Sequence, residues 1–178
     1  MSETETETAA PKEEWEILIY PDKRLRIKSE PVTEVTDAIR RKGLALMDLM
    51  HQARGIGLAA PQVGWHVQIL AINLSGKRQD GLVFLNPKIV STSKATFTAS
   101  EMCLSVPGIS GKIERPREAT ITSMNFDGEL NEFKLDGLLA RCFLHEYDHL
   151  EGVLFIDRLS SAKKLSIKKK LKRLGGPE

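Results

Sequence analysis

Apolar residues recur at helical spacing in three segments of the chain. Thr36 can cap a first helix over residues 36–52, whose apolar side chains fall on one face. A second helix is predicted over residues 136–151, with Gly152 as a natural stop. Residues 161–173 form a third candidate helix, in which a few apolar residues are spaced among lysines.

Between the first two helices, shorter apolar runs are typical of strands. Residues 67–73 follow a glycine-punctuated turn at 55–64 and form a continuous apolar run, which predicts a buried strand. Further strands are predicted at four places, residues 82–86, 88–96, 119–126 and 131–135. Asp127 and Gly128 separate the last two and are typical of a hairpin turn.

Length and composition restrict the class of protein. The 178 residues suffice for one domain with a sizeable core and are too few for two ordinary ones. Hydrophobic residues at 41% and charged residues at 28% argue against disorder throughout the chain. No apolar run approaches the roughly 20 residues that span a bilayer, so no membrane partner is expected. The two cysteines, Cys103 and Cys142, are too few for a disulfide framework.

Charge divides the chain into three parts. Residues 1–14 carry five acids and one lysine and lack apolar periodicity, so they are predicted to form a disordered arm. This start has the features of neither a secretory signal nor a transit peptide, and a cytoplasmic protein is expected. Residues 15–162 are neutral overall and are predicted to form the single folded domain. Residues 163–178 form a basic C-terminal helix and tail.

The basic tail carries seven bases and one acid. One interpretation is a solvated helix that packs through Leu165 and a few neighbours. The other is an electrostatic contact with ribosomal RNA. The neutral body argues against a protein that binds nucleic acid over its whole surface, and no DNA partner is expected.

Residues 145–149 read HEYDH, an H-E-x-x-H motif within the second predicted helix. His145 and His149 project from one face a turn apart, so both can bind one metal ion, with Glu146 beside them. The alternative is a helix with two surface histidines. Leu138 and Cys142 continue the stripe of the two histidines at spacings of three and four, which indicates that this face points inward.

Two histidines need a third protein ligand if water is to occupy the fourth position of a metal ion. Metallopeptidases with this motif usually add a Glu or His further along the chain, but the acids after His149 are poorly placed: Glu151, Asp157 and Glu178. A general metallopeptidase is therefore poorly supported. Of the two thiols, Cys142 is more simply a core residue, and Cys103 is the better candidate ligand.

Three motifs, in this order, resemble those of the peptide deformylase family: GIGLAAPQ at 55–62, EMCLS at 101–105 and HEYDHLEG at 145–152. The likeness covers roughly residues 17–159. It implies removal of the N-formyl group from the formyl-methionine of nascent peptides, with release of formate. It also implies one divalent metal ion, generally Fe²⁺ although Zn²⁺, Ni²⁺ or Co²⁺ can occupy such sites, held by Cys103, His145 and His149.

The resemblance and the chemistry assign roles to further residues. Glu146 can act as the base that accepts a proton from the attacking water. The resemblance implies that the Gln62 amide and the Leu104 backbone N–H donate hydrogen bonds to the formyl oxygen. Seven residues are expected to contact the substrate: Ile56, Gly57, Leu58, Glu101, Met102, Leu138 and Cys142. Arg141 lies near the same wall.

Two positions depart from the family pattern. Met102 stands where a glycine usually precedes the cysteine, and Leu144 stands where a glutamine usually precedes the first histidine. Met102 could crowd the substrate or alter the backbone if the glycine served a special φ/ψ. A deformylase-like protein with weak or altered activity, acting as a metal- or peptide-binding module, is therefore the alternative to an active deformylase.

The expected fold is α+β. Short, mostly antiparallel strands should wrap around the central metal-binding helix, as the deformylase resemblance implies. The first helix should pack outside them, and a basic helix should end the chain.

Overall fold

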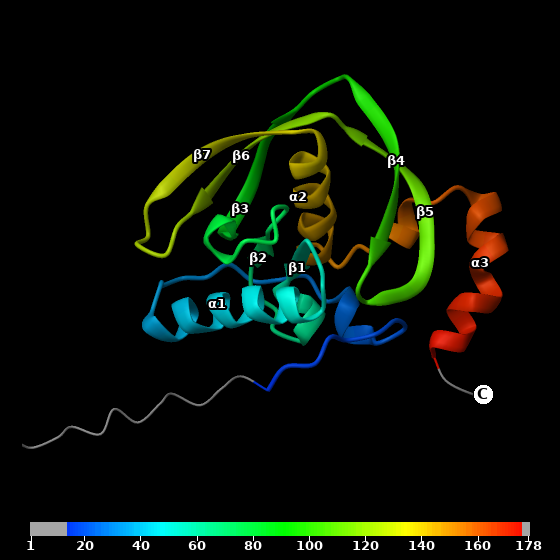
Figure 1. Ribbon diagram of the computed structural model, residues 1–178, viewed down its shortest axis with the longest axis horizontal. Helices are drawn as coiled ribbons and strands as arrows, with labels where there is room; N and C mark the ends of the chain where they lie inside the picture. Colours follow the sequence, from blue (N-terminus) through cyan, green and yellow to red (C-terminus); the bar gives the residue numbers. More distant parts are fainter. Residues whose placement is uncertain (1–13, 176–178) are drawn as a thin grey trace, which may run out of the picture.

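A computed structural model of the protein describes residues 14–175 (Figure 1). Its three α-helices are α1 (Asp37–Gln52), α2 (Gly137–Leu150) and α3 (Ser161–Leu174). Each lies within one residue of its predicted bounds. Thr36 caps α1 as expected, because its hydroxyl accepts a hydrogen bond from the Ile39 N–H at 3.2 Å. Gly152 follows α2 with a φ of 73°, the left-handed conformation that favours glycine after a helix.

Seven strands form two antiparallel sheets. The larger has the order β1 (Gly57–Ala59), β2 (Ile69–Ile72), β3 (Leu82–Thr92), β6 (Glu118–Met124) and β7 (Leu130–Asp136). The smaller is a hairpin of β4 (Thr96–Cys103) and β5 (Val106–Pro116). Four 3₁₀ helices connect these elements: η1 (Lys23–Arg26), η2 (Ala60–Val63), η3 (Arg78–Asp80) and η4 (Phe155–Arg158).

The large sheet is covered on both faces, as the side chains of β2 show. Its side chains alternate between the faces: Leu70 and Ile72 join the core cluster that includes α2, whereas Ile69 and Ala71 join the cluster that includes α1. A strand with apolar residues on both faces reads as a continuous apolar run, as predicted for residues 67–73. Figure 1 shows α2 surrounded by the curved strands, with α1 running beneath them.

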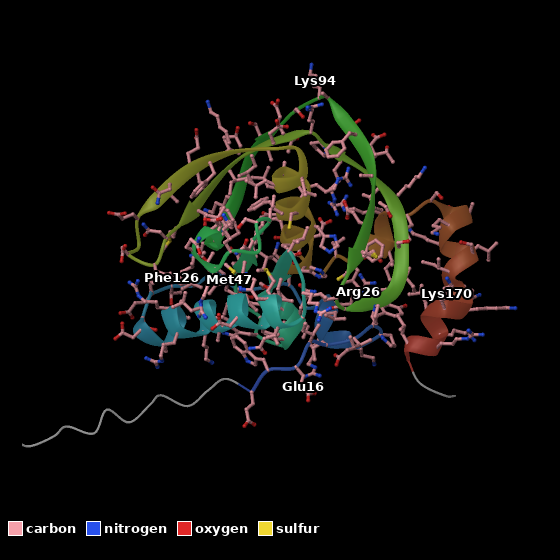
Figure 2. All side chains as sticks on the ribbon, viewed as in Figure 1. Glu16, Arg26, Met47, Lys94, Phe126 and Lys170 are labelled. Atoms are coloured by element: carbon pink, nitrogen blue, oxygen red, sulfur yellow. The ribbon has the colours of Figure 1, made fainter. Side chains whose placement is uncertain are left out.

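The C-terminal helix packs differently from the prediction. Leu165 is 73% exposed and does not hold α3 in place. Instead Ile167 is buried in the core cluster of β5 and η4, and Leu171 and Leu174 pack against the same cluster. The remaining surface of α3 is lysine-rich, and Figure 2 shows Lys170 at the outer edge of the molecule.

The α+β fold with mostly antiparallel strands around α2 is confirmed, but the strands differ from the prediction in three places. The predicted strand 82–86 and residues 88–92 of the predicted strand 88–96 form one strand, β3, whose register shifts between Leu85 and Lys88, whereas residues 93–95 lie in the turn before β4. The hairpin of β4 and β5 was not predicted, and β1 lies within the predicted turn at 55–64.

The predicted acidic arm lies outside the described residues, apart from Glu14. Within residues 14–175, no helix has the length and apolar character needed to cross a membrane. The predicted boundaries of the domain and the tail stay predictions.

Candidate active site

Two histidines of α2 and the cysteine that ends β4 meet in the interior of the protein. His145 and His149 lie one turn apart on the buried face of α2. Cys103 is the last residue of β4, where the two-residue turn 104–105 leads into β5. The ligand atoms of the three side chains lie within 4.8 Å of one another. The fold therefore brings together the three residues predicted to bind a metal.

The geometry and charge of this cluster fit a divalent ion. Cys103 Sγ lies 3.3 Å from His149 Nε2, a separation compatible with two ligands of one tetrahedral ion at about 2.0–2.3 Å. Burial lowers the pKa of His149 well below its usual value, which keeps the imidazole in the neutral form that binds metals. Burial also opposes charge on His145, but hydrogen bonds with Cys103 and Glu101 raise its pKa to about 10. A positive charge is thus favoured at this point, and a bound metal ion would supply it in place of the proton on the imidazole.

Glu101 holds the His145 ring through the nitrogen that does not face the ligand cluster. Its Oε2 accepts a hydrogen bond from His145 Nδ1 at 2.9 Å, which leaves Nε2 of the ring for the cluster. Arg115 donates to both oxygens of Glu101, at 2.6 and 2.9 Å, and Arg141 donates to Oε1 at 2.7 Å. Burial opposes charge on Glu101, but the hydrogen bonds from His145 and Arg115 outweigh it and lower the pKa of this carboxyl to about 2. A charged Glu101 therefore fixes the orientation of the imidazole.

Asp148 extends this buried network towards the surface. Arg115 Nη1 donates to Asp148 Oδ2 at 2.9 Å, and Arg158 of η4 donates to both Asp148 oxygens at 2.6 Å. None of these three residues was predicted from the sequence to belong to the site. The sequence feature that could have indicated Asp148 is its position three residues after His145 on the same helix. Its partners come from β5 and η4, and sequence spacing does not reveal such pairings.

The Gln62 side chain of η2 directs its amide nitrogen at the cluster. Its Oε1 accepts a hydrogen bond from the Ala59 N–H at 2.8 Å. The amide Nε2 then donates to Ser105 Oγ at 3.1 Å and to Cys103 Sγ at 3.6 Å. Leu104 is the next residue after Cys103 and lines the same cavity. Both residues predicted to donate to the formyl oxygen thus border the metal cluster.

Glu146 brings a buried carboxylate to the cavity. Within the described part of the chain, its Oε2 is buried and has no hydrogen-bond partner. Burial raises the pKa of Glu146 to about 7. The carboxylate lies against Gly57, where a Cβ atom would come within 2.8 Å of the Glu146 carboxyl carbon. A buried carboxylate with this pKa is suited to exchange a proton near neutral pH.

One cavity of about 510 Å³ is lined by Gln62, Glu101, Cys103, Leu104, Arg141, His145 and Glu146, but not by His149 or the Arg115–Asp148–Arg158 part of the network. Six of the seven residues predicted to contact the substrate also line it: Ile56, Gly57, Glu101, Met102, Leu138 and Cys142. Leu58 does not, because its side chain is fully buried in the core cluster against α1. Leu138 lines the cavity but is exposed, so the prediction that it points into the core was wrong.

A sequence model that describes polypeptide deformylase matches residues 15–165, which include the three motifs and the whole metal cluster. The chain belongs to the polypeptide deformylase family. Deformylases are metal-dependent hydrolases, and the chain is accordingly an enzyme. The alternative of a protein that only binds metal or peptide is not favoured.

Individual deformylases are similar over most of their length. The peptide deformylase of Acinetobacter baumannii (strain SDF) is 43% identical over 158 residues, which cover 89% of this chain and 90% of that relative. Peptide deformylase 1 of Ralstonia nicotianae is 45% identical over 157 residues, or 88% of this chain and 93% of the relative. A crystal structure of the Plasmodium falciparum deformylase superposes with a TM-score of 0.86 at 39% identity, covering 89% of this chain and 94% of the other.

The two departures from the deformylase motifs leave the metal cluster intact. Met102 is not among the described non-glycine residues with positive φ, which are Arg54 and Asn86, so the backbone at residue 102 has no need of glycine. Its side chain is 74% exposed beside the cavity. Leu144 is buried in the core cluster between α2 and the sheet, where an apolar side chain is accommodated.

Proposed function

We propose that this deformylase hydrolyses the N-formyl amide of formyl-methionine at the start of nascent peptides and releases formate. The observation that carries the proposal is the placement of the Glu146 carboxylate in the cavity that Cys103, His145 and Gln62 also line. A base, a site for a metal ion and a hydrogen-bond donor for the formyl oxygen are the groups that metal-dependent amide hydrolysis requires.

Cys103, His145 and His149 would hold the metal ion, and we propose Fe²⁺ on the basis of the family resemblance. A cysteine with two histidines also suits Zn²⁺, Ni²⁺ or Co²⁺, so the ligands alone do not select one metal. When bound, the ion supplies Lewis acidity, which polarises the formyl carbonyl and lowers the pKa of water.

Glu146 would transfer a proton from the attacking water to the departing amine. Its carboxylate accepts a proton from the water that attacks the formyl carbon. The same residue then protonates the departing amine nitrogen, so the C–N bond breaks and formate and a free N-terminus are produced. The pKa of about 7 suits both steps near neutral pH.

Gln62 and Leu104 would stabilise the charge that develops on the formyl oxygen. Gln62 is pre-oriented because the Ala59 N–H holds its Oε1. The Leu104 N–H is the proposed second donor. Removal of one such donor typically lowers the rate on the order of a hundredfold or more.

The cavity wall would receive the methionine side chain. Ile56, Leu138 and Cys142 supply apolar surface. Glu101 contributes little free charge to this wall, because two arginines and His145 already engage its oxygens.

The test is formate release from formyl-Met-Ala-Ser by protein purified anaerobically with Fe²⁺. Acetyl-Met-Ala-Ser and the unblocked peptide serve as controls for formyl specificity and for peptidase activity. We expect rapid formate release from the formyl peptide, no cleavage of the unblocked peptide and about one ion per chain. Cleavage of the unblocked peptide, or no formate release at full metal occupancy, would contradict the proposal.

We also propose that the enzyme works in the cytoplasm and that α3 contacts ribosomal RNA. The lysines at 168–170 are exposed, whereas Ile167 holds the helix to the body. Reversal of these three charges (Lys168→Glu, Lys169→Glu, Lys170→Glu) should abolish cosedimentation with ribosomes at low salt and leave turnover of a short peptide unchanged. The matched control reverses three exposed lysines elsewhere: Lys88, Lys94 and Lys134. Equal effects of both triple variants would refute a contact through α3.

A further inference from the structure

Two strands that line the cavity each pair with a neighbour on one side only. Among residues 14–175, strand β1 is an outer strand of the large sheet and pairs with β2, whereas β4 pairs only with β5. Residue Gly57 of β1 and residues 100–103 of β4 line the cavity. Unpaired strand edges bind extended peptides through main-chain hydrogen bonds. An extended substrate can therefore lie along β4 as it reaches the metal cluster.

Side chains alternate along β4 where it lines the cavity. Glu101 and Cys103 are turned inward and are 6% and 7% exposed, whereas Met102 is turned outward and is 74% exposed. A peptide strand beside β4 has the same alternation. If its first side chain enters the cavity with Glu101, its second side chain lies on the face of Met102.

The Met102 side chain has room on that face. Its partner across the hairpin is Ser110, which is small and does not cover it. Methionine is flexible and polarisable, and its sulfur makes favourable contacts with aromatic rings. Side chains opposite each other on adjacent strands contribute to strand pairing. Met102 is thus placed to contact the second residue of an extended substrate.

We propose that Met102 determines specificity for the residue that follows the formyl-methionine, with a preference for apolar and above all aromatic side chains. This inference rests on the proposed function. The proposed contact lies outside the methionine pocket and is made by the Met102 side chain.

The test compares kcat/KM for formyl-Met-Phe-Ala and formyl-Met-Ser-Ala. The ratio of the two values is the readout, because a general loss of activity or stability lowers both. We expect the Phe-to-Ser ratio to fall about two- to fivefold in Met102→Ala. Met102→Leu, which keeps an apolar side chain, should retain most of the ratio.

The control variant is Leu130→Ala. Leu130 is 68% exposed at the start of β7 and is not among the residues that line the cavity, so its removal should leave the ratio unchanged. An unchanged ratio in Met102→Ala, or an equal fall in Leu130→Ala, would overturn the proposal. Absence of formate release from both peptides by the unsubstituted enzyme would instead contradict the proposed function, and the inference with it.

Discussion

Gly57 of β1 packs its backbone directly against the carboxylate of Glu146 in α2. A Cβ atom on residue 57 would lie 2.8 Å from the Glu146 carboxyl carbon and closer still to Oε1. The second glycine of the GIGLAAPQ motif therefore leaves room for the proposed base. The deformylase resemblance predicts that this glycine contacts the substrate, and the structure adds a steric reason that no spacing rule contains.

Gly57→Ala should displace Glu146 and lower kcat for deformylation by about 100-fold, since misplacement of a reacting group by about 1 Å can cost that much. The metal content should stay at the unsubstituted level, because the three atoms nearest to a Cβ at residue 57 all belong to Glu146 and none to a metal ligand. Steady-state formate release and metal analysis on the same sample provide the check. In a Glu146→Gln background, the same substitution should have little further effect on the rate. Independent losses in the double variant would refute the steric explanation.

The two cysteines form a matched pair for a test of metal binding. Both are buried and border the cavity, but only Cys103 lies in the ligand cluster. Cys103→Ser should weaken metal binding by at least about 100-fold, because it replaces a ligand, whereas Cys142→Ser should retain about one ion per chain. Metal content after dialysis against a weak chelator distinguishes the two. Loss of metal from both variants would show that the metal is lost because the fold is disturbed and not because a ligand has been removed.

Glu101 should make the stability of the metal-free protein depend on pH. Its pKa is about 2 in the folded protein against an ordinary value of 4.5. Its stabilising contribution is therefore complete above about pH 4.5 and is lost as the pH falls towards 2, with a total of about 3 kcal/mol. Urea unfolding at several pH values, with chelator present, measures this change in the free energy of unfolding.

The control is Glu101→Gln, which should show a flatter dependence of unfolding free energy on pH over the same range. The substitution should also lower stability at pH 7, because Arg115 and Arg141 lose a buried charged partner. Parallel pH profiles for the two proteins would mean that other carboxyls cause the acid sensitivity.

The helices and the ligand spacing could be predicted because their causes are local. Thr36 caps α1 through a residue three positions away, and Gly152 ends α2 through its own backbone conformation. His145 and His149 share a face because of helical periodicity alone. Each of these features depends on residues within one helical turn.

The β4–β5 hairpin and the buried charges could not be predicted in the same way. Inward positions of these strands carry Glu101 and Arg115, which read as polar and break the alternation expected of a half-buried strand. The turn between the strands, Leu104–Ser105, lacks the glycine or asparagine that marks most tight hairpins. Glu101 and Arg115 pair only after the hairpin has formed, so the cause of their burial lies in the tertiary structure.

Glu146→Gln tests the central claim most directly, because it removes the acid–base function and keeps the size of the side chain. The measurement is kcat for formate release from formyl-Met-Ala-Ser by the Fe²⁺-loaded variant, with metal content and thermal stability recorded on the same preparation. We predict a loss of about 1,000-fold in kcat with one ion still bound. A variant that binds metal fully and turns over at close to the original rate would contradict the assignment of Glu146 as the catalytic base.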